Sequence, residues 1–174
     1  EVFFLREDLE VGDSLYGIIF AMWTAGMVVG ALFVARRIAV AGLATATLVA
    51  VAVQGAGLGL PTAWLAVGFA GAAWFVGGVG HGTKNTLARS LIQQRVPDRL
   101  HGRAFAAYNG IRNSAELIAL AGGGLLVAVL GGRATLALAG GLSMLAGLAG
   151  LAIHLRANPH ELPDAEVELQ QGPA

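Results

Sequence analysis

Long stretches without charge constrain this chain more than any other feature of its sequence. Residues 14–35, 38–83 and 134–155 contain no Asp, Glu, Lys or Arg. A helix of about 20 apolar residues spans the roughly 30 Å hydrocarbon core of a bilayer. Uniformly apolar stretches of this length fit helices, whereas a membrane barrel would show short strands of alternating polarity. The sequence therefore predicts an all-α, polytopic transmembrane helix bundle.

Basic pairs, prolines and paired glycines divide the bundle, expected over residues 1–155, into separate spans. The predicted spans lie at about 15–35, 38–60, 63–83, 105–130 and 134–155. Val2 to Leu5 are apolar and no signal-peptide pattern precedes them, so the chain looks cut and the start resembles the end of a sixth span. Residues 156–174 contain three prolines and four acidic residues without apolar periodicity, which predicts a disordered cytoplasmic tail.

Small residues recur at helical spacing inside the spans. Gly26 and Gly30 form a GxxxG pair on the first span, and Ser143 and Gly147 form a similar pair on the last. Small residues let helix backbones approach closely in lipid. We expect both pairs to pack against other helices of the same chain.

The basic residues lie almost entirely on one side of the predicted spans. If five spans alternate, one side carries only Arg6 and Arg133. The other side carries Arg36, Arg37, Lys84, Arg89, Arg95, Arg99, Arg103 and Arg156. The positive-inside rule predicts that this second side, with the C-terminus, lies on the cytoplasmic side of a cell membrane.

The fourth span breaks the apolar rule. Its polar residues are Asn109, Arg112, Asn113 and Glu116, whose spacing puts them on one helix face. Charged groups inside a span usually face the protein interior or a water-filled cavity. The stripe predicts a substrate or proton pathway with Glu116 as the protonatable or substrate-contacting carboxylate. The alternatives are a static Arg112–Glu116 pair that braces two helices, and an Arg112 that extends to the membrane surface.

A second polar face ends the third span. His81, Lys84 and Asn85 lie at i, i+3 and i+4. His81 and Asn85 are candidates for the cytoplasmic mouth of the same cavity. The alternative is a helix end that leaves the membrane, where polar residues are expected in any case, and this explanation fits Lys84 best.

Patterns typical of enzymes and nucleic-acid binding proteins are missing from the sequence. There is no cysteine, no HExxH, no serine in GxSxG, and no nucleotide-binding spacing in the glycine run at 77–82. The sequence therefore predicts no catalytic residue, no metal site and no cofactor. Net charge is zero, and the basic segment at 84–103 is better explained by topology and lipid headgroup contact than by nucleic acid.

The connection after the third span carries a family resemblance. It resembles the cytoplasmic loop between helices 10 and 11 of major facilitator superfamily exporters, and most of all the pattern Q-x-x-V-P-D-x-x-x-G-R of enterobactin and macrolide-type efflux proteins. The matching residues are Gln93, Val96, Pro97, Asp98, Gly102 and Arg103.

This resemblance implies the C-terminal half of a twelve-helix transporter, from the end of helix 7 to helix 12. It further implies proton-driven export of a small molecule by alternating access. The implied partners are the missing N-terminal half, the lipid bilayer and the small-molecule substrate. The alternative function is a non-transporting membrane subunit or receptor module that interacts through helix faces.

The same loop supplies candidates for a cytoplasmic gate. These are Arg95, Pro97, Asp98, Arg99, Gly102 and Arg103. We expect Pro97 to end the third helix and Gly102 to permit the turn back. Arg99 and Arg103 could cap helix ends, bind lipid phosphate or lock against the other half, while topology and headgroup anchoring need no gate.

Overall fold

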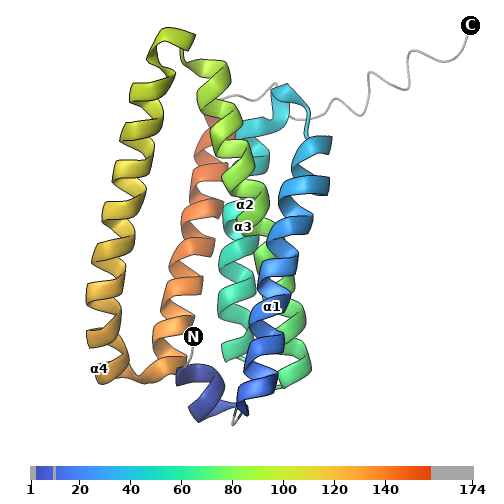
Figure 1. Ribbon diagram of the computed structural model, residues 1–174, viewed down its shortest axis with the longest axis vertical. Coiled ribbons are helices and arrows are strands. Elements are labelled where there is room, and N and C mark those ends of the chain that lie inside the picture. The colour runs from blue at the N-terminus through green and yellow to red at the C-terminus, as the bar shows by residue number, and fades with distance from the viewer. Residues whose placement is uncertain (1–2, 10, 158–174) are drawn as a thin grey trace, which may run out of the picture.

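The computed structural model describes residues 3–9 and 11–157, and its regular elements are all helical (Figure 1). The four long helices are α1 (Asp13–Val29), α2 (Leu43–Gly59), α3 (Val67–Arg95) and α4 (His101–Ala157). A π-helical turn, Gly30–Val34, and a 3-10 turn, Ala35–Arg37, extend α1. The remaining short elements are a π-helix at Phe4–Asp8 and 3-10 turns at Val40–Gly42, Leu60–Thr62 and Asp98–Leu100. The predicted all-α class is confirmed.

Gly131 divides α4 into two arms, residues 101–130 and 132–157. Its φ of 79° and ψ of 166° interrupt the helix, and it is the only glycine with positive φ in the described part of the chain. A side chain disfavours this region of backbone space, whereas glycine enters it readily. The tight turn expected from the paired glycines at this point is confirmed.

Three helical segments are long and apolar enough to cross a membrane, judged by length and composition. They are Asp13–Arg37, Val40–Thr62 and Asp98–Ala157, and the last contains both arms of α4. Helix α3 is not among them. It begins at Val67, later than the expected residue 63, and it is rich in glycine and polar beyond Thr83. Its apolar part is therefore shorter and less hydrophobic than a span starting at residue 63 would be.

Glycines bring α1 and α3 into backbone contact. A Cβ placed on Gly26 or Gly30 of α1 would overlap the carbonyls of Phe75 and Val79 on α3. Thr83 then donates a hydrogen bond from Oγ1 to the carbonyl of Gly30 (3.2 Å). The predicted packing role of the first glycine pair within the chain is confirmed.

The second arm of α4 packs on α2 in the same way. Gly147 lies against Ala52, and Ser143 donates a hydrogen bond to the carbonyl of Val51 (3.5 Å). Gly140 lies against Gly59, nearer the Gly131 end of the same contact. The predicted packing role of the Ser143–Gly147 pair is also confirmed.

An apolar cluster closes the end of the bundle where α1 begins. Phe4 and Leu5 are completely buried and pack with Ile19, Trp74 and Leu136. This cluster fixes the short N-terminal helix against α1, α3 and the second arm of α4.

The first arm of α4 stands apart from the other helices (Figure 1). Its apolar side chains are exposed around the helix, including Ile111 and Ile118 (both 74%) and Val129 (72%). The described helices bury little of it, although the sequence predicts a span as apolar as its neighbours. The predicted tail at 156–174 lies almost wholly outside the described residues, which end at Ala157.

Candidate functional site

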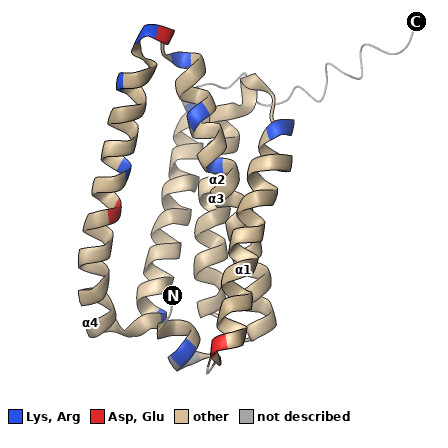
Figure 2. Ribbon diagram, viewed as in Figure 1, with Lys and Arg blue, Asp and Glu red and all other residues tan. Residues whose placement is uncertain are grey.

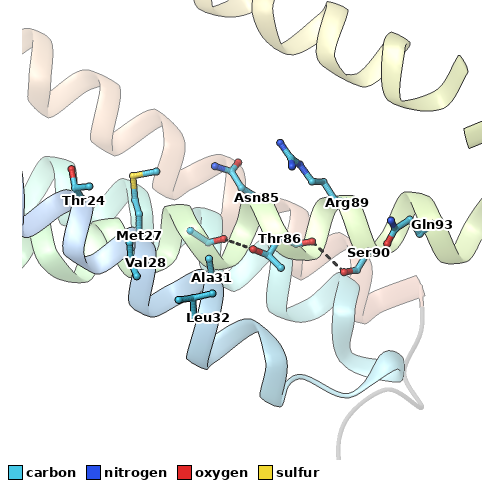
Figure 3. A pocket seen from close by; sticks show the side chains of 11 residues that line it. Thr24, Met27, Val28, Ala31, Leu32, Asn85, Thr86, Arg89, Ser90 and Gln93 are labelled. Carbon is cyan, nitrogen blue, oxygen red and sulfur yellow. Dashed lines mark hydrogen bonds between the residues drawn. The ribbon is translucent and has the colours of Figure 1, made fainter. Parts of the chain in front are cut away.

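A cleft of about 630 Å³ lies between α1, its π-helical extension and α3 (Figure 3). The wall formed by α1 is largely apolar and includes Met27, Val28 and Leu32. The wall formed by α3 is polar and is made by Asn85, Thr86, Arg89, Ser90 and Gln93. The cleft therefore offers an apolar surface on one side and hydrogen-bonding groups on the other.

The polar wall arises from a four-residue repeat in α3. His81, Asn85, Arg89 and Gln93 recur at i, i+4, i+8 and i+12, so they form a continuous stripe along one face. Figure 3 shows Asn85 and Arg89 projecting from the same side of α3. His81 and Asn85, at the start of this stripe, were predicted from the sequence. Its continuation through Arg89 and Gln93 was not, although these residues follow at the same four-residue spacing.

Hydroxyl groups in this wall are already satisfied by their own helix. Thr86 donates to the carbonyl of Gly82 (3.1 Å), and Ser90 donates to the carbonyl of Thr86 (3.2 Å). The amide of Asn85 and the guanidinium of Arg89 have no hydrogen bond within the described residues. The side-chain amide of Gln93 makes none either, because only its backbone carbonyl is bonded, so these three side chains are the polar groups of the cleft that are available to a ligand.

The predicted polar stripe of the fourth span lies on the first arm of α4. Its members Asn109, Arg112, Asn113 and Glu116 are all exposed. Arg112 and Glu116 form no ion pair within 4.0 Å; the pairs among described residues are Arg6–Asp13 and His101–Asp98. The static pair that was one alternative for this stripe is therefore not formed.

Charged members of the α3 and α4 stripes nevertheless lie close enough to interact. Arg112 and Glu116 lie within electrostatic range of His81, and Arg112 also lies within range of Lys84. The two helices are antiparallel and joined by a short loop, so residues equally far from the loop have the same depth. At 1.5 Å per residue, His81 and Glu116 are both roughly 20 Å from the loop end of their helices.

The His81 side chain, on α3, lies next to Trp23 of α1. Its ring centroid lies 5.7 Å from that of Trp23, with the planes inclined by 51°. The His81 Nδ1 atom is buried and has no hydrogen-bond partner in the described part of the chain. Sequence reasoning missed Trp23, since a single aromatic residue in an apolar span carries no distinguishing signal.

The loop between α3 and α4 is closed by His101. Its Nε2 atom lies 2.9 Å from the carbonyl oxygen of Val96 and 3.2 Å from that of Gln93. Both partners are acceptors, so Nε2 carries the proton and donates. Pro97 adopts an extended backbone after α3 ends at Arg95, which agrees with its expected helix-ending role.

Gly102 does not make the turn that was expected of it. It lies inside the first turn of α4, and a Cβ there would meet nothing within 4 Å. The chain reverses instead through extended residues 96 and 97 and the 3-10 turn Asp98–Leu100. Backbone geometry that ordinary residues can adopt is sufficient for this reversal, so the glycine is not needed for it.

The other gate candidates are exposed at this end of the bundle. Arg95, Asp98, Arg99 and Arg103 all face outward. Figure 2 shows basic residues gathered around the α3–α4 connection and a sparser mixed set at the opposite end. Among residues 3–9 and 11–157, no three His, Asp or Glu side chains are placed to hold a metal ion.

A glycine-packed helical bundle with three segments long and apolar enough to cross a membrane indicates a polytopic membrane protein. The family model for the Major Facilitator Superfamily matches residues 2–173, and the chain belongs to that family. This match confirms the superfamily inferred from the loop motif. Members of the family are membrane transporters. No curated protein and no solved structure matches the chain.

Proposed function

We propose that the chain acts as the C-terminal half of a twelve-helix transporter that exports a small molecule. In this assignment the Phe4–Asp8 segment ends helix 7, α1 to α3 are helices 8 to 10, and the arms of α4 are helices 11 and 12. The likeness of the 93–103 loop to enterobactin and macrolide-type efflux proteins supports export.

One observation supports the proposed pathway: charged residues of the α4 stripe lie close enough to the α3 stripe to interact with it, at about the same depth. His81 on α3 is within electrostatic range of Arg112 and Glu116 on α4, although these helices hardly touch. Polar groups in an apolar bundle are costly unless they serve water, a partner or a ligand. Together with Asn85 and Arg89, they provide both charged and neutral contacts for a small amphipathic molecule.

The exposed first arm of α4 supports a second half of the transporter. Its apolar residues are exposed on all faces, so lipid contact on one side leaves another side for helices of a partner half. Alternating access then requires the arm to move relative to α3, to which it is tied mainly through the short loop. Glu116 is the carboxylate on this arm that could exchange a proton between the two states.

The charge distribution supports an orientation with the α3–α4 loop and the C-terminus in the cytoplasm of the cell membrane. Arg95, Arg99 and Arg103 lie at that end, together with Arg36 and Arg37. In this orientation the loop arginines are placed to contact anionic headgroups or the other half of the transporter.

Glu116→Gln in the complete transporter tests the proposal. We expect proton-dependent efflux from cells or proteoliposomes to fall at least tenfold, because the amide keeps the size of the side chain but cannot exchange a proton. Ser114→Ala, on the same arm and equally exposed, is the matched control and should retain efflux. Unchanged, still proton-dependent efflux in the Glu116→Gln variant would remove Glu116 from the mechanism.

A further inference from the structure

A second cleft, of about 460 Å³, lies between the end of α1 and the first half of α2, over α3. It forms because α1 and α2 both pack on α3 rather than on each other. Its walls include Ile38, Val49 and Val53, and its floor includes Val79 and Gly80. We name this second cleft the lipid groove. It is separate from the polar cleft between α1 and α3 described above.

The groove is long, apolar and cationic at one end. Along α2 its lining extends from Gly42 to Val53, which is about 16 Å at 1.5 Å per residue. Arg37 lines the end where α1 finishes, and its side chain is exposed. No Asp or Glu lines the groove, so the charge of Arg37 is not balanced within it.

An unused hydroxyl lies on the α2 wall toward the same end. Thr45 lines the groove, and its Oγ1 has no hydrogen-bond partner in the described part of the chain. Thr47, two residues further along and not in the groove, donates to the carbonyl of Leu43 (2.7 Å). The hydrogen-bonding capacity of the Thr45 hydroxyl is therefore unused within the described residues.

We propose that the lipid groove binds an anionic phospholipid, with its phosphate on Arg37 and one acyl chain between α1 and α2. Charge complementarity identifies this occupant. An apolar channel with a single cation at its end matches an acyl chain that ends in an anionic headgroup, and basic sites at helix ends are known to recruit such lipids. The proposal depends on neither the direction nor the coupling of transport.

Adjacent arginines provide a matched test. Arg36 and Arg37 are both exposed and carry the same charge, but only Arg37 lines the groove. The chain is reconstituted in nanodiscs of phosphatidylglycerol and phosphatidylcholine, extracted gently, and the retained lipids are counted by native mass spectrometry. We expect preferential retention of phosphatidylglycerol, lowered about fivefold by Arg37→Gln and little changed by Arg36→Gln.

A second variant tests the acyl-chain site without changing charge. Val49 is 42% exposed and lines the groove, so Val49→Phe fills it with little strain, whereas Val129→Phe adds the same ring to the first arm of α4. We expect lipid retention to fall for the first and not for the second. Equal effects of the two arginine variants, equal retention of both lipids, or full retention by Val49→Phe would each overturn the proposal. Circular dichroism and a thermal melt confirm that each variant is folded.

Discussion

The contact between α1 and α3 gives the sharpest stability prediction, at Gly82. Its Cα lies so close to Met27 that an added Cβ would overlap the Met27 carbonyl oxygen and carbon. The neighbour is backbone on a packed helix, so it can relax only if the two helices separate. Gly82→Ala should therefore push α1 and α3 apart.

The expected loss follows from two contributions. Overpacking in a close-packed interior costs about 1–3 kcal/mol. Separation would also weaken the Thr83–Gly30 hydrogen bond, which is worth about 0.5–1.5 kcal/mol. The better helix propensity of Ala returns up to about 1 kcal/mol. We expect a net loss of about 1–3 kcal/mol in the free energy of unfolding.

The assay is denaturant unfolding of the purified chain in detergent, followed by tryptophan fluorescence. Trp23 is in the disrupted contact and reports on it directly, since Gly78 of α3 lies against its carbonyl. The control is Gly122→Ala, where a Cβ meets nothing within 4 Å and stability should be unchanged or slightly higher. Equal stability of the two variants would refute the close-contact argument.

Three further predictions concern the turn, the interhelical hydrogen bond and the chain as a unit. Gly131→Ala should lower the free energy of unfolding by about 1–3 kcal/mol, because its φ and ψ are nearly exclusive to glycine, whereas helical Gly141→Ala should not. Thr83→Val should lower it by about 0.5–1.5 kcal/mol in the same assay; no change would show that the Gly30 carbonyl needs no donor. The chain alone in liposomes should show no vectorial transport, and measurable substrate accumulation would contradict its proposed role as half of a transporter.

The sequence predicted those parts of the fold that depend on local periodicity. Uncharged stretches predicted helices, and the spacing of Gly26 and Gly30 predicted a packing face, because both depend only on the helical repeat. The turn at Gly131 was predicted correctly, because the paired glycines between two apolar stretches mark the place where the chain reverses. The role of Gly102 was wrong because a loop of extended and 3-10 residues reverses the chain without positive φ.

Features that depend on partners were less predictable. Residues 101–130 are exposed because few other helices lie near enough to pack against them. Hydropathy predicts that a segment is a helix but does not predict which helices it contacts. The role of His101 was not predicted, because its bonds to Gln93 and Val96 depend on the path of the loop. The lipid groove needs α1 and α2 to be held apart on α3, which no local pattern indicates.

The proximity of Arg112 and Glu116 to His81 could have been derived from the sequence. Once α3 and the first arm of α4 are joined by a loop as short as 96–100, they must be antiparallel neighbours at that end, and depth follows from counting outward. Lys84 and Arg112 each lie about 16 Å from the loop end of their helices, and His81 and Glu116 lie slightly deeper. The deepest polar residues of the two stripes therefore lie at about the same depth, as expected if both line one aqueous path. A helix end that merely leaves the membrane would explain Lys84 alone, but it would not require a matching carboxylate on the opposite helix.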